Sequence, residues 1–404
     1  MNKAKQVAIA GAGIGGLSAA LALAKTGHKV TIFEQASQLG EVGAGLQMSP
    51  NAMKVLRYLG VEDALRAFAF VPQHACIRHF KSGDYYLKSP LGASSEARYG
   101  APYWHLHRAD LHKVLLAACE KVGVTLVLGR SVESYLEQDD QVIVMLADKS
   151  QHRADLLIGA DGIRSVIREQ MLGKESPTFM KQVAWRGVIP VSELDGVTIQ
   201  PDACVWVGPK RHLVTYYLRG GEWVNFVAVE ERDDWHQESW REEGDINELK
   251  AAFAGWHPEV SGLLAKAQST FLWALNGREA LSTWHQGRVV LLGDACHPML
   301  PFMAQGAAMA IEDAYALGRL LEQHALPLAL ARYEALRKPR ATKIQAMSKD
   351  NAGLYHMRGG ALGRMKLNAL RVASEYCPQL IHAKLDPVYG YDLEGELVDS
   401  SREG

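Results

Sequence analysis

The stretch Val7-Ala8-Ile9-Ala10-Gly11-Ala12-Gly13-Ile14-Gly15-Gly16 decides the fold of the N-terminal part of this chain. Four apolar residues lead into a GxGxxG turn, and an Ala/Leu-rich run over residues 17–24 follows. This order predicts a strand, a tight turn and a helix. Glycines at such a turn let the backbone approach a pyrophosphate, which then faces the unpaired N–H groups at the helix N-terminus. Gly11, Gly13, Gly15 and Gly16 are therefore candidate contacts of a dinucleotide, whose kind the turn alone does not specify.

Residues 29–34 extend this start to a βαβ unit of about 30 residues, the size typical of dinucleotide-binding motifs. Glu34 closes the second strand, roughly 20 residues after the turn, where an acid binds a ribose hydroxyl. From residue 183 to residue 229 the composition changes to runs of β-branched and aromatic residues that are separated by glycine and proline, which predicts an antiparallel sheet. The sequence is rich in Ala, Leu and Ile again over residues 306–323, which predicts a helix.

Composition limits the possible functions. The 404 residues leave room for two domains, and a formal net charge of −1 gives no electrostatic case for binding nucleic acid or an anionic membrane surface. Five scattered cysteines without CxxC spacing are typical of reduced thiols in a cytoplasm, not of a disulfide framework or a metal site. Four glycines interrupt the chargeless run over residues 6–24, so we do not interpret it as a signal peptide. We expect a soluble, cytoplasmic protein that binds no metal.

Four motifs together resemble a known family. GAGIGG (11–16), HRADL (107–111), GADG (159–162) and the pair Gly293-Asp294 occur in the order found in single-component FAD-dependent aromatic hydroxylases, the p-hydroxybenzoate hydroxylase superfamily. The resemblance runs from residue 6 to about residue 345. Within the superfamily the chain is similar to the salicylate, 3-hydroxybenzoate and 6-hydroxynicotinate monooxygenases. The segments that carry this likeness are EVGAGLQMSPNA (41–52), RHLVTYYLRGG (211–221), GDACHPMLPFMAQGAAMAIEDA (293–314) and VYGYDL (388–393).

The resemblance implies an α/β fold in which a Rossmann-like FAD-binding domain is discontinuous. Residues 1–175 and 286–345 would form this domain and include some substrate-facing strands. A mainly antiparallel β-sheet domain for the substrate, residues 176–285, would interrupt it. Residues 346–404 would form C-terminal helices and a tail. A homodimer is a further expectation from the family.

The resemblance also assigns cofactor contacts. Gly15, Glu34 and Gln35 would hold the adenosine end of FAD, and Arg108 and the backbone of Val132 would continue that site. Asp294 would bind the ribityl chain, and Asp161 would serve both FAD and a passing NADH or NADPH. Gly306 and Ala307 would lie near the isoalloxazine ring, because a helix that opens there points its positive end at developing negative charge. An ordinary helix start that needs glycine for packing is the alternative.

The chemistry that the resemblance implies needs an electron-rich ring. FAD reduced by NADH or NADPH reacts with O₂ to a C4a-hydroperoxide, whose terminal oxygen is electrophilic, so the substrate would be a small phenolic acid such as salicylate or 3-hydroxybenzoate. His212 and Tyr216 lie four residues apart on a candidate strand and hence on one face. Histidine is suited to proton transfer near neutral pH. We expect this pair to deprotonate and position the phenol, although ordinary sheet residues would fit the same pattern.

Further substrate contacts follow from the same family. Gln47, Cys204 and Phe302 would line the ring pocket. The 6-hydroxynicotinate enzymes have histidines in place of Gln47 and Phe302 but match at Cys204, His212 and Tyr216, so the mixture favours a hydroxybenzoate over a nicotinate. An arginine is the natural anchor for a carboxylate. Arg186 and Arg219 are candidates for it, and a surface position suits either equally well.

Three other functions remain open at this stage. A larger phenol such as a quinolone would suit the same chemistry, because the size of the pocket is not readable from the sequence. An NAD-dependent dehydrogenase would explain the first glycine turn but not the Gly293-Asp294 segment or the interrupted topology. A flavin-binding protein without hydroxylase activity would explain both motifs.

Overall fold

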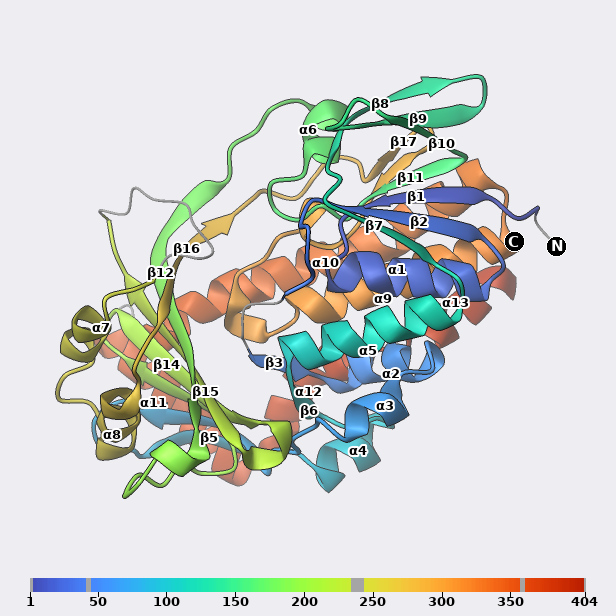
Figure 1. Ribbon diagram of the computed structural model, residues 1–404. Helices are drawn as coiled ribbons and strands as arrows, with labels where there is room; N and C mark the ends of the chain where they lie inside the picture. The colour runs from blue at the N-terminus through green and yellow to red at the C-terminus, as the bar shows by residue number, and fades with distance from the viewer. Residues whose placement is uncertain (1–2, 41–44, 234–242, 357–359, 403–404) are drawn as a thin grey trace.

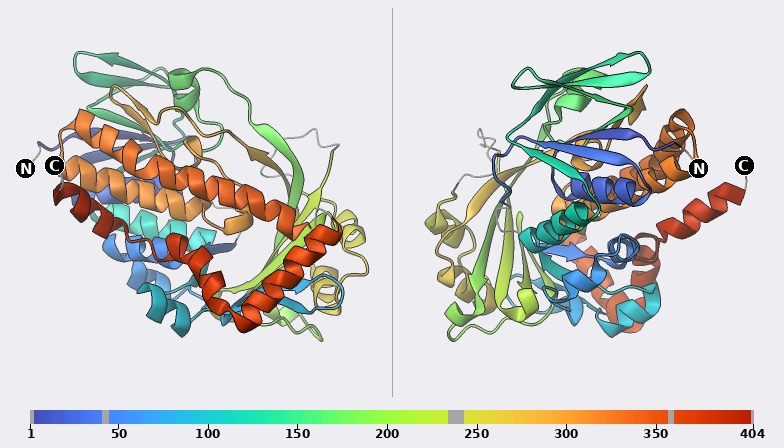
Figure 2. Two further views of the ribbon diagram at one scale, coloured as in Figure 1. Left: turned by 180° about the vertical axis from the view of Figure 1, so that it is seen from behind. Right: turned by 45° about the vertical axis from the view of Figure 1, so that its right-hand side comes forward.

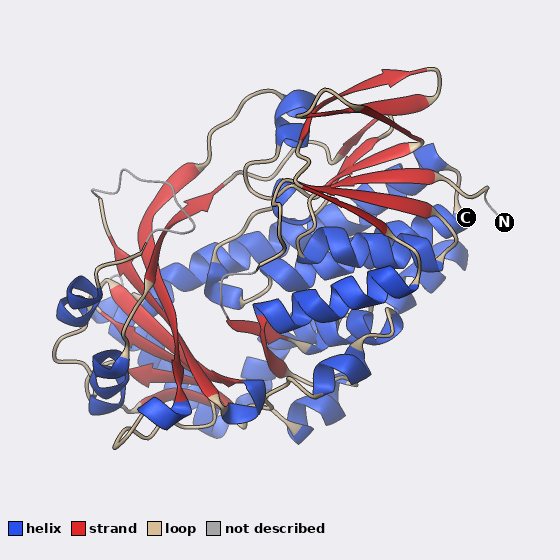
Figure 3. Cartoon of the chain, in the orientation of Figure 1, coloured by secondary structure: helices blue, strands red, loops and turns tan. Residues whose placement is uncertain are grey.

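The computed structural model describes residues 3–40, 45–233, 243–356 and 360–402. Within these residues, a parallel sheet flanked by helices occupies one end of the molecule and a large antiparallel sheet occupies the other (Figures 1 and 3). Residues 41–44, which begin the EVGAGLQMSPNA segment, lie outside the described residues.

The parallel sheet is built around β1. Its six strands have the order β17-β18-β11-β1-β2-β7, and of these six only β17 runs antiparallel to its neighbour. Four of the five residues of β1 are buried, as expected for a central strand covered on both faces. The strands are β1 Gln6–Ala10, β2 Lys29–Glu34, β7 Thr125–Leu128, β11 Leu156–Gly159, β17 His285–Gln286 and β18 Val289–Leu291.

Four long helices pack beside this sheet (Figure 1). They are α1 Ile14–Lys25, α5 Arg108–Lys121, α9 Gly306–Gln323 and α10 Leu326–Tyr355. α1 lies directly against α9, where a Cβ on Gly318 would come within 2.9 Å of the Cβ of Ala22. The N-terminal and C-terminal halves of the chain therefore share one core, which fixes the turn after β1 relative to the start of α9.

The antiparallel sheet has seven strands in the order β16-β12-β15-β14-β13-β4-β5. One face packs on α7 Ile246–Ala252 and α8 Pro258–Lys266 through a core that contains Trp185, Trp206 and Phe226. Because side chains alternate along a strand, the residues between these face the interior of the molecule. The strands are β4 His74–His79, β5 Tyr85–Pro90, β12 Thr178–Pro190, β13 Ala203–Gly208, β14 Arg211–Leu218, β15 Trp223–Glu231 and β16 Phe271–Gly277.

Smaller elements join the two sheets. β3 Gly45–Met48 and β6 Trp104–His107 form a two-stranded ribbon, drawn in Figure 1 between the helices and the large sheet. A three-stranded sheet contains β8 Val132–Gln138, β9 Gln141–Leu146 and β10 Gln151–Ala154. The remaining helices before residue 200 are α2 Pro50–Tyr58, α3 Glu62–Arg66, α4 Ala93–Tyr99 and α6 Val166–Leu172.

The C-terminal helices return across the molecule. Figure 2 shows from behind how the last helices run from the large sheet back toward the parallel sheet. α11 Ala361–Tyr376 contacts β5, α12 Pro378–Tyr389 contacts α2, and α13 Leu393–Arg402 contacts α9. This segment thus touches both ends of the fold.

The structure confirms the expected fold class, with a Rossmann-like part, an antiparallel sheet and C-terminal helices. The detailed division into domains stays a prediction, and two features cut across its boundaries. β4 and β5 come from before residue 176 yet belong to the large sheet, because β4 pairs in parallel with β13. α10 runs without a break through residue 345. Among the described residues, no helix is both long and apolar enough to cross a membrane.

Candidate active site

The glycine turn between β1 and α1 has the geometry of a pyrophosphate cradle. Gly11 has a φ of +101°, and a Cβ there would lie 2.5 Å from the carbonyl oxygen of Ala160. A Cβ on Gly16 would collide with the carbonyl oxygen of Gly11. Gly13 instead faces open space and is the N-cap of α1, without a capping side chain. Gly11 and Gly16 therefore shape the turn, and Gly13 leaves its backbone accessible to an anion at the helix N-terminus.

Glu34 lies beside this turn at the end of β2. Its carboxylate accepts hydrogen bonds from two backbone N–H groups, of which that of Ala12 lies at 2.8 Å. Gln35 follows and is exposed. The backbone N–H of Arg130 donates to the carbonyl oxygen of Glu34 at 2.9 Å, which brings the first residue of β8, Val132, to the same edge. The residues expected at the adenosine end of FAD thus come together.

Asp161 follows β11 and is oriented by the start of α6. Its Oδ2 accepts the backbone N–H of Val166 at 2.8 Å and that of Ile167 at 3.3 Å. Its Oδ1 is buried and has no hydrogen-bond partner among the described residues. Burial raises the pKa of this carboxyl above its usual range. Asp161 is therefore held in place with one oxygen left for a ligand.

Asp294 keeps exposed surface although its chain neighbours are buried. Gly293 and Ala295 are buried but Asp294 is exposed, and burial in the surrounding protein nevertheless raises the pKa of its carboxyl. The charges of His297 and of Arg108, the first residue of α5, act in the opposite direction on this pKa. Asp294 and Arg108 thus approach one space from distant parts of the sequence. A side chain with free surface so deep in the fold is placed to contact an enclosed ligand.

The segment after Asp294 ends in an uncapped helix start. α9 begins at Gly306, and its N-cap residue Gln305 makes no capping hydrogen bond with its side chain. The first turn contains no acidic residue. The N–H groups of Gly306 and Ala307 have no acceptor within the helix, because the first turn of any α-helix lacks them. The positive end of α9 is therefore available to a negatively charged ring.

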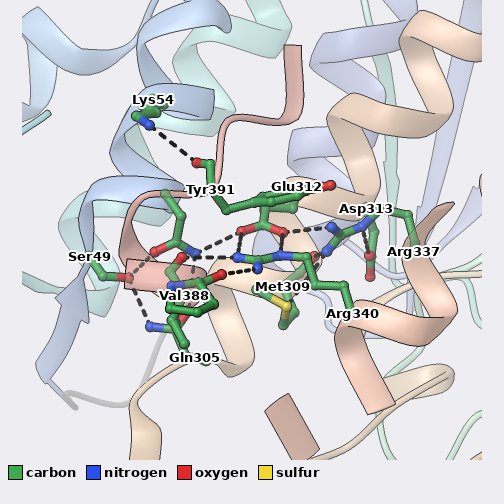
Figure 4. A network of polar contacts seen from close by, with 12 residues as sticks. Ser49, Lys54, Gln305, Met309, Glu312, Asp313, Arg337, Arg340, Val388 and Tyr391 are labelled. Atoms are coloured by element: carbon green, nitrogen blue, oxygen red, sulfur yellow. Dashed lines mark hydrogen bonds and ion pairs between the residues drawn. The ribbon is translucent and has the colours of Figure 1, made fainter. Parts of the chain in front are cut away.

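A buried polar network fixes this helix start (Figure 4). Gln305 donates from Nε2 to Ser49 Oγ at 2.8 Å. Eight residues further along α9, Asp313 accepts from Arg337 at 2.8 Å and lies 2.5 Å from His297 Nε2. Its Oδ2 also accepts the backbone N–H of Gly293 at 3.3 Å. Asp313 thus joins α9 and α10 to the loop that carries Asp294, so the two cofactor-facing segments are held together.

The expected proton-transfer pair lies on the interior face of the large sheet. His212 and Tyr216 are both buried on β14 and lie on one face, about 13 Å apart along the strand. Tyr216 packs so tightly on β3 that a Cβ on Gly45 would lie 2.5 Å from its ring. The backbone N–H of Gly45 donates to Asn225 Oδ1 at 2.9 Å, which docks β3 on the sheet.

Gln47 belongs to the same neighbourhood. It lies opposite His105 in the β3–β6 ribbon, and its Oε1 accepts the hydroxyl of Tyr103 at 2.8 Å. The ring of His105 lies 4.8 Å from the ring of Tyr216. His105 is fully buried, and burial lowers its pKa to about 3, so it is neutral at physiological pH. Gln47 and Tyr216 are therefore brought together through His105.

His212 lies among aromatic side chains. Its ring centroid is 5.0 Å from that of Phe302 and 5.2 Å from that of Tyr355, and its Nδ1 lies 2.8 Å from His356 Nε2. Burial holds the pKa of His212 well below its usual value, and His356 lowers it further. The expected juxtaposition of His212 with Phe302 is thus present. A neutral imidazole is the form that accepts a proton.

Cys204 is not brought to this group. Cys204 pairs with Thr215 across β13 and β14, so the two side chains lie on the same face of the sheet. That face is opposite to the one that carries His212 and Tyr216, because side chains alternate along a strand. There it belongs to the core under α7 and α8, together with Trp206. The expected contact of Cys204 with a substrate beside His212 needs correction for this reason. A shift of one residue along a strand moves a side chain to the opposite face of the sheet.

The two candidate arginines differ in their partners. Arg219 binds Asp110 through two hydrogen bonds, of 2.8 and 2.9 Å. Arg186 has no carboxylate partner among the described residues, and its guanidinium lies 4.4 Å from the ring centroid of Trp273. Its Nε is buried without a hydrogen bond. Burial lowers the pKa of Arg186 to about 10, while Tyr216 raises it and Arg108 lowers it. Arg186 is therefore an unneutralised cation near Tyr216.

Arg186 lies on the interior face as well. It pairs with Val227, which in turn pairs with Val214, the residue midway between His212 and Tyr216. Directly paired residues share a face, so the side chain of Arg186 lies on the same face of the sheet as His212 and Tyr216.

The C-terminal helices supply side chains that sequence reasoning missed. Tyr355 and Tyr389 keep some exposed surface, although burial raises the pKa of both, that of Tyr389 to about 12. The rings of Tyr389 and Tyr103 lie 5.8 Å apart. Tyr355 from α10 and Tyr389 from α12 thus add partly exposed phenol side chains beside the groups around His212 and Tyr103. The VYGYDL segment was the one signal that pointed to Tyr389, and no local pattern marks Tyr355 or His356.

The fold and the glycine turn together define a protein with a dinucleotide-binding turn on a parallel sheet and a second, antiparallel sheet beside it. The sequence family described as FAD binding domain matches residues 4–348. The chain belongs to this family. The match confirms both FAD as the cofactor and the resemblance to the FAD-dependent aromatic hydroxylases.

Relatives with known names support the same class. The 6-hydroxynicotinate 3-monooxygenase of Pseudomonas fluorescens is 40% identical over 362 residues, which cover 88% of this chain and 93% of that protein. The 3-hydroxybenzoate 6-hydroxylase of Polaromonas naphthalenivorans is 34% identical over 394 residues, 96% of each chain. The crystal structure of Klebsiella pneumoniae HpxO complexed with FAD and uric acid has a TM-score of 0.85 and 28% identity, covering 96% of this chain and 98% of that one. The chain is a flavoprotein aromatic monooxygenase.

Proposed function

We propose that this enzyme hydroxylates a small phenolic aromatic acid of the salicylate or 3-hydroxybenzoate type, with O₂ and NADH or NADPH as co-substrates. The observation that carries the proposal is the guanidinium of Arg186, which no carboxylate neutralises among the described residues. A buried charge is costly until an opposite charge reaches it. An aromatic carboxylate offers the planar pair of oxygens that arginine binds best.

The overall reaction balances with one oxygen atom of O₂ entering the ring and the other leaving as water. NADH or NADPH supplies the two electrons. When bound, FAD supplies the redox chemistry that connects the nicotinamide to O₂. Asp294, Asp161 and Glu34 would hold it, and the N-terminus of α9 would favour negative charge on its ring by on the order of 0.5–2 kcal/mol.

The residues of the chain would orient and ionise the substrate. With its carboxylate on Arg186, a phenol would lie against the sheet face that carries His212 and Tyr216. Neutral His212 would accept the phenolic proton, and the hydroxyl of Tyr216 would position the phenolate. Phe302 and Tyr355 would exclude water from this end of the site.

A hydroxynicotinate is the second candidate, favoured by the 40% identity to the Pseudomonas fluorescens enzyme. It also combines a carboxylate with a ring hydroxyl, so Arg186 and His212 suit it equally. The 6-hydroxynicotinate enzymes have histidines in place of Gln47 and Phe302. These differences favour a hydroxybenzoate, because Gln47 lies near Tyr216 and Phe302 lies beside His212.

A substrate panel tests the proposal. Purified holoenzyme is mixed with salicylate, 3-hydroxybenzoate, 6-hydroxynicotinate, a hydroxyquinoline and phenols without a carboxylate, each with NADH and with NADPH. Nicotinamide oxidation and product mass are measured together. We expect one of the monocyclic acids to stimulate oxidation and to gain a single oxygen atom. Product from the neutral phenols alone would contradict the proposed substrate class. A cytoplasmic location and a homodimer remain expectations, which fractionation and light scattering can check.

A further inference from the structure

A continuous line of hydrogen bonds leads from His212 to the surface. His212 Nδ1 lies 2.8 Å from His356 Nε2, and His356 Nδ1 lies 2.8 Å from Glu231 Oε1. Both histidines are 1% exposed, whereas the side chain of Glu231 is 20% exposed. Three residues from β14, the end of α10 and β15 thus connect the interior face of the large sheet with solvent.

The carboxylate at the end of this line fixes the protons of both imidazoles. Glu231 accepts, so His356 donates from Nδ1 and, in its neutral form, presents the lone pair of Nε2. That lone pair accepts from His212, which therefore carries its proton on Nδ1. The remaining nitrogen of His212, Nε2, keeps its lone pair and has no hydrogen bond among the described residues. His212 is hence set as a proton acceptor toward the site.

Among the described residues, the groups around His212 are mostly neutral aromatic side chains. Tyr355 from α10 and Phe302 face His212, and burial raises the pKa of Tyr355, so its hydroxyl stays neutral. On β14 and β15 the nearest charged neighbours along the strands are Arg211 and Glu230, which pair with each other, and Glu230 also binds Arg232. Lys210 contacts the line only through its backbone, whose N–H donates to the carbonyl oxygen of His356 at 3.0 Å.

We propose that His212, His356 and Glu231 form a relay that carries the substrate's phenolic proton to the surface of the protein. The inference rests on the proposed function, because it needs a phenol beside His212. The phenolic proton binds His212 Nε2 as the Nδ1 proton of His212 moves to His356 Nε2. The Nδ1 proton of His356 moves in turn to the carboxylate of Glu231, which releases it to water. Both imidazoles end neutral with their tautomers exchanged, and one proton has left the site.

In this relay His212 is the catalytic residue, and His356 and Glu231 are positioning residues that act through it. Burial explains why they are needed. A buried imidazole whose pKa is held low does not keep a proton, so ionisation of the phenol requires that the proton be passed on. Without the relay, the neutral phenol would remain the stable form in the closed site.

The adjacent carboxylates of β15 offer a matched test. The variants are Glu231→Gln, which ends the relay, His356→Gln, which breaks its middle, and Glu230→Gln, which removes the neighbouring carboxylate outside it. Each holoenzyme is mixed rapidly with the aromatic acid that the wild type turns over, in weak buffer with a pH indicator dye. Proton release, the absorbance of the bound phenolate and coupling of NADH oxidation to product are followed from pH 6 to pH 9.

We expect Glu231→Gln and His356→Gln to slow proton release at least about tenfold and to uncouple NADH oxidation, since loss of a general base commonly costs ~100- to 10,000-fold. Their acid limb of kcat/KM should move to higher pH, with FAD content unchanged. Glu230→Gln should keep the wild-type rates. Equal proton release in Glu231→Gln and wild type would overturn the relay, even if His356→Gln failed to fold. A wild type that turns over no hydroxylated aromatic acid would instead overturn the proposed function.

Discussion

Replacing Arg186 by methionine separates substrate binding from stability more sharply than any other change in the site. Methionine keeps much of the unbranched stem of the side chain and removes the charge. In the structure the guanidinium lies over the ring of Trp273 and has no carboxylate partner among the described residues, and burial lowers its pKa to about 10. A base whose pKa is lower in the folded than in the unfolded state destabilises the fold when it is protonated. For Arg186 this cost is fully present at every pH below its folded-state pKa. The unliganded variant should therefore be more stable than the wild type, by roughly 1–3 kcal/mol.

Activity should change in the opposite direction. A hydrogen-bonded charge pair contributes about 1.5–3 kcal/mol, which corresponds to about a 10- to 150-fold loss of kcat/KM for the carboxylated substrate. A neutral analogue such as 3-hydroxybenzyl alcohol makes no such pair. Its already low kcat/KM should hardly change, so the variant loses its preference for the acid.

The assay compares 3-hydroxybenzoate with 3-hydroxybenzyl alcohol in Arg186→Met and wild type, together with thermal unfolding without substrate. Arg219→Met is the matched control, because Arg219 is paired with Asp110 and its loss leaves a buried carboxylate alone. The control should lose stability and keep the preference for the acid. Equal losses for both ligands in Arg186→Met, or a lower unfolding temperature, would refute the assignment of Arg186 as the carboxylate anchor.

The remaining predictions concern the cofactor cradle and the buried charges. Asp294→Ala should purify with little FAD, as read from the ratio of flavin to protein absorbance; full flavin content would remove this residue from the site. Gly13→Ala should fold normally but bind FAD weakly, whereas Gly16→Ala, whose Cβ meets the carbonyl oxygen of Gly11, should lower the urea midpoint of unfolding. Arg337→Met should cost about 3–5 kcal/mol at pH 7, because Glu312 and Asp313 lose their buried partner. Because the pKa of both carboxyls is depressed in the folded state, the stability they contribute is full above the ordinary carboxyl pKa and is lost as the pH falls below it through the depressed value, so the gap to wild type should narrow in urea titrations below pH 4; an unchanged gap would contradict the charge pairing.

The sequence predicts the parts of the fold that local chemistry specifies. Gly16 is required by its contact with Gly11 within a single turn, and Gly11 has a positive φ of +101° at that turn, so the motif alone locates both. Arg186 and Arg219 look alike in the sequence, because only the tertiary fold brings Asp110 to one of them. Cys204 was placed with the substrate by family likeness, and the imperfect alternation of its strand hid that it faces the core. Tyr355 and His356 lie at the end of a helix whose sequence carries no sign of the site. This helix end is more than a hundred residues away from His212 along the chain.

The late position of these residues affects the order in which the enzyme matures. All segments expected to bind FAD lie before the end of α9 at Gln323, whereas Tyr355 and Tyr389, which we expect to border the substrate, come from α10 and α12. A chain still being synthesised can therefore assemble its cofactor cradle before these two side chains are in place. We expect a polypeptide cut short before α12 to bind flavin but to lack Tyr389, and its NADH oxidation should then be less well coupled to product and yield more hydrogen peroxide. The C-terminal helices are thus the segment at which a frameshift or a proteolytic cut would turn the enzyme into an oxidant source.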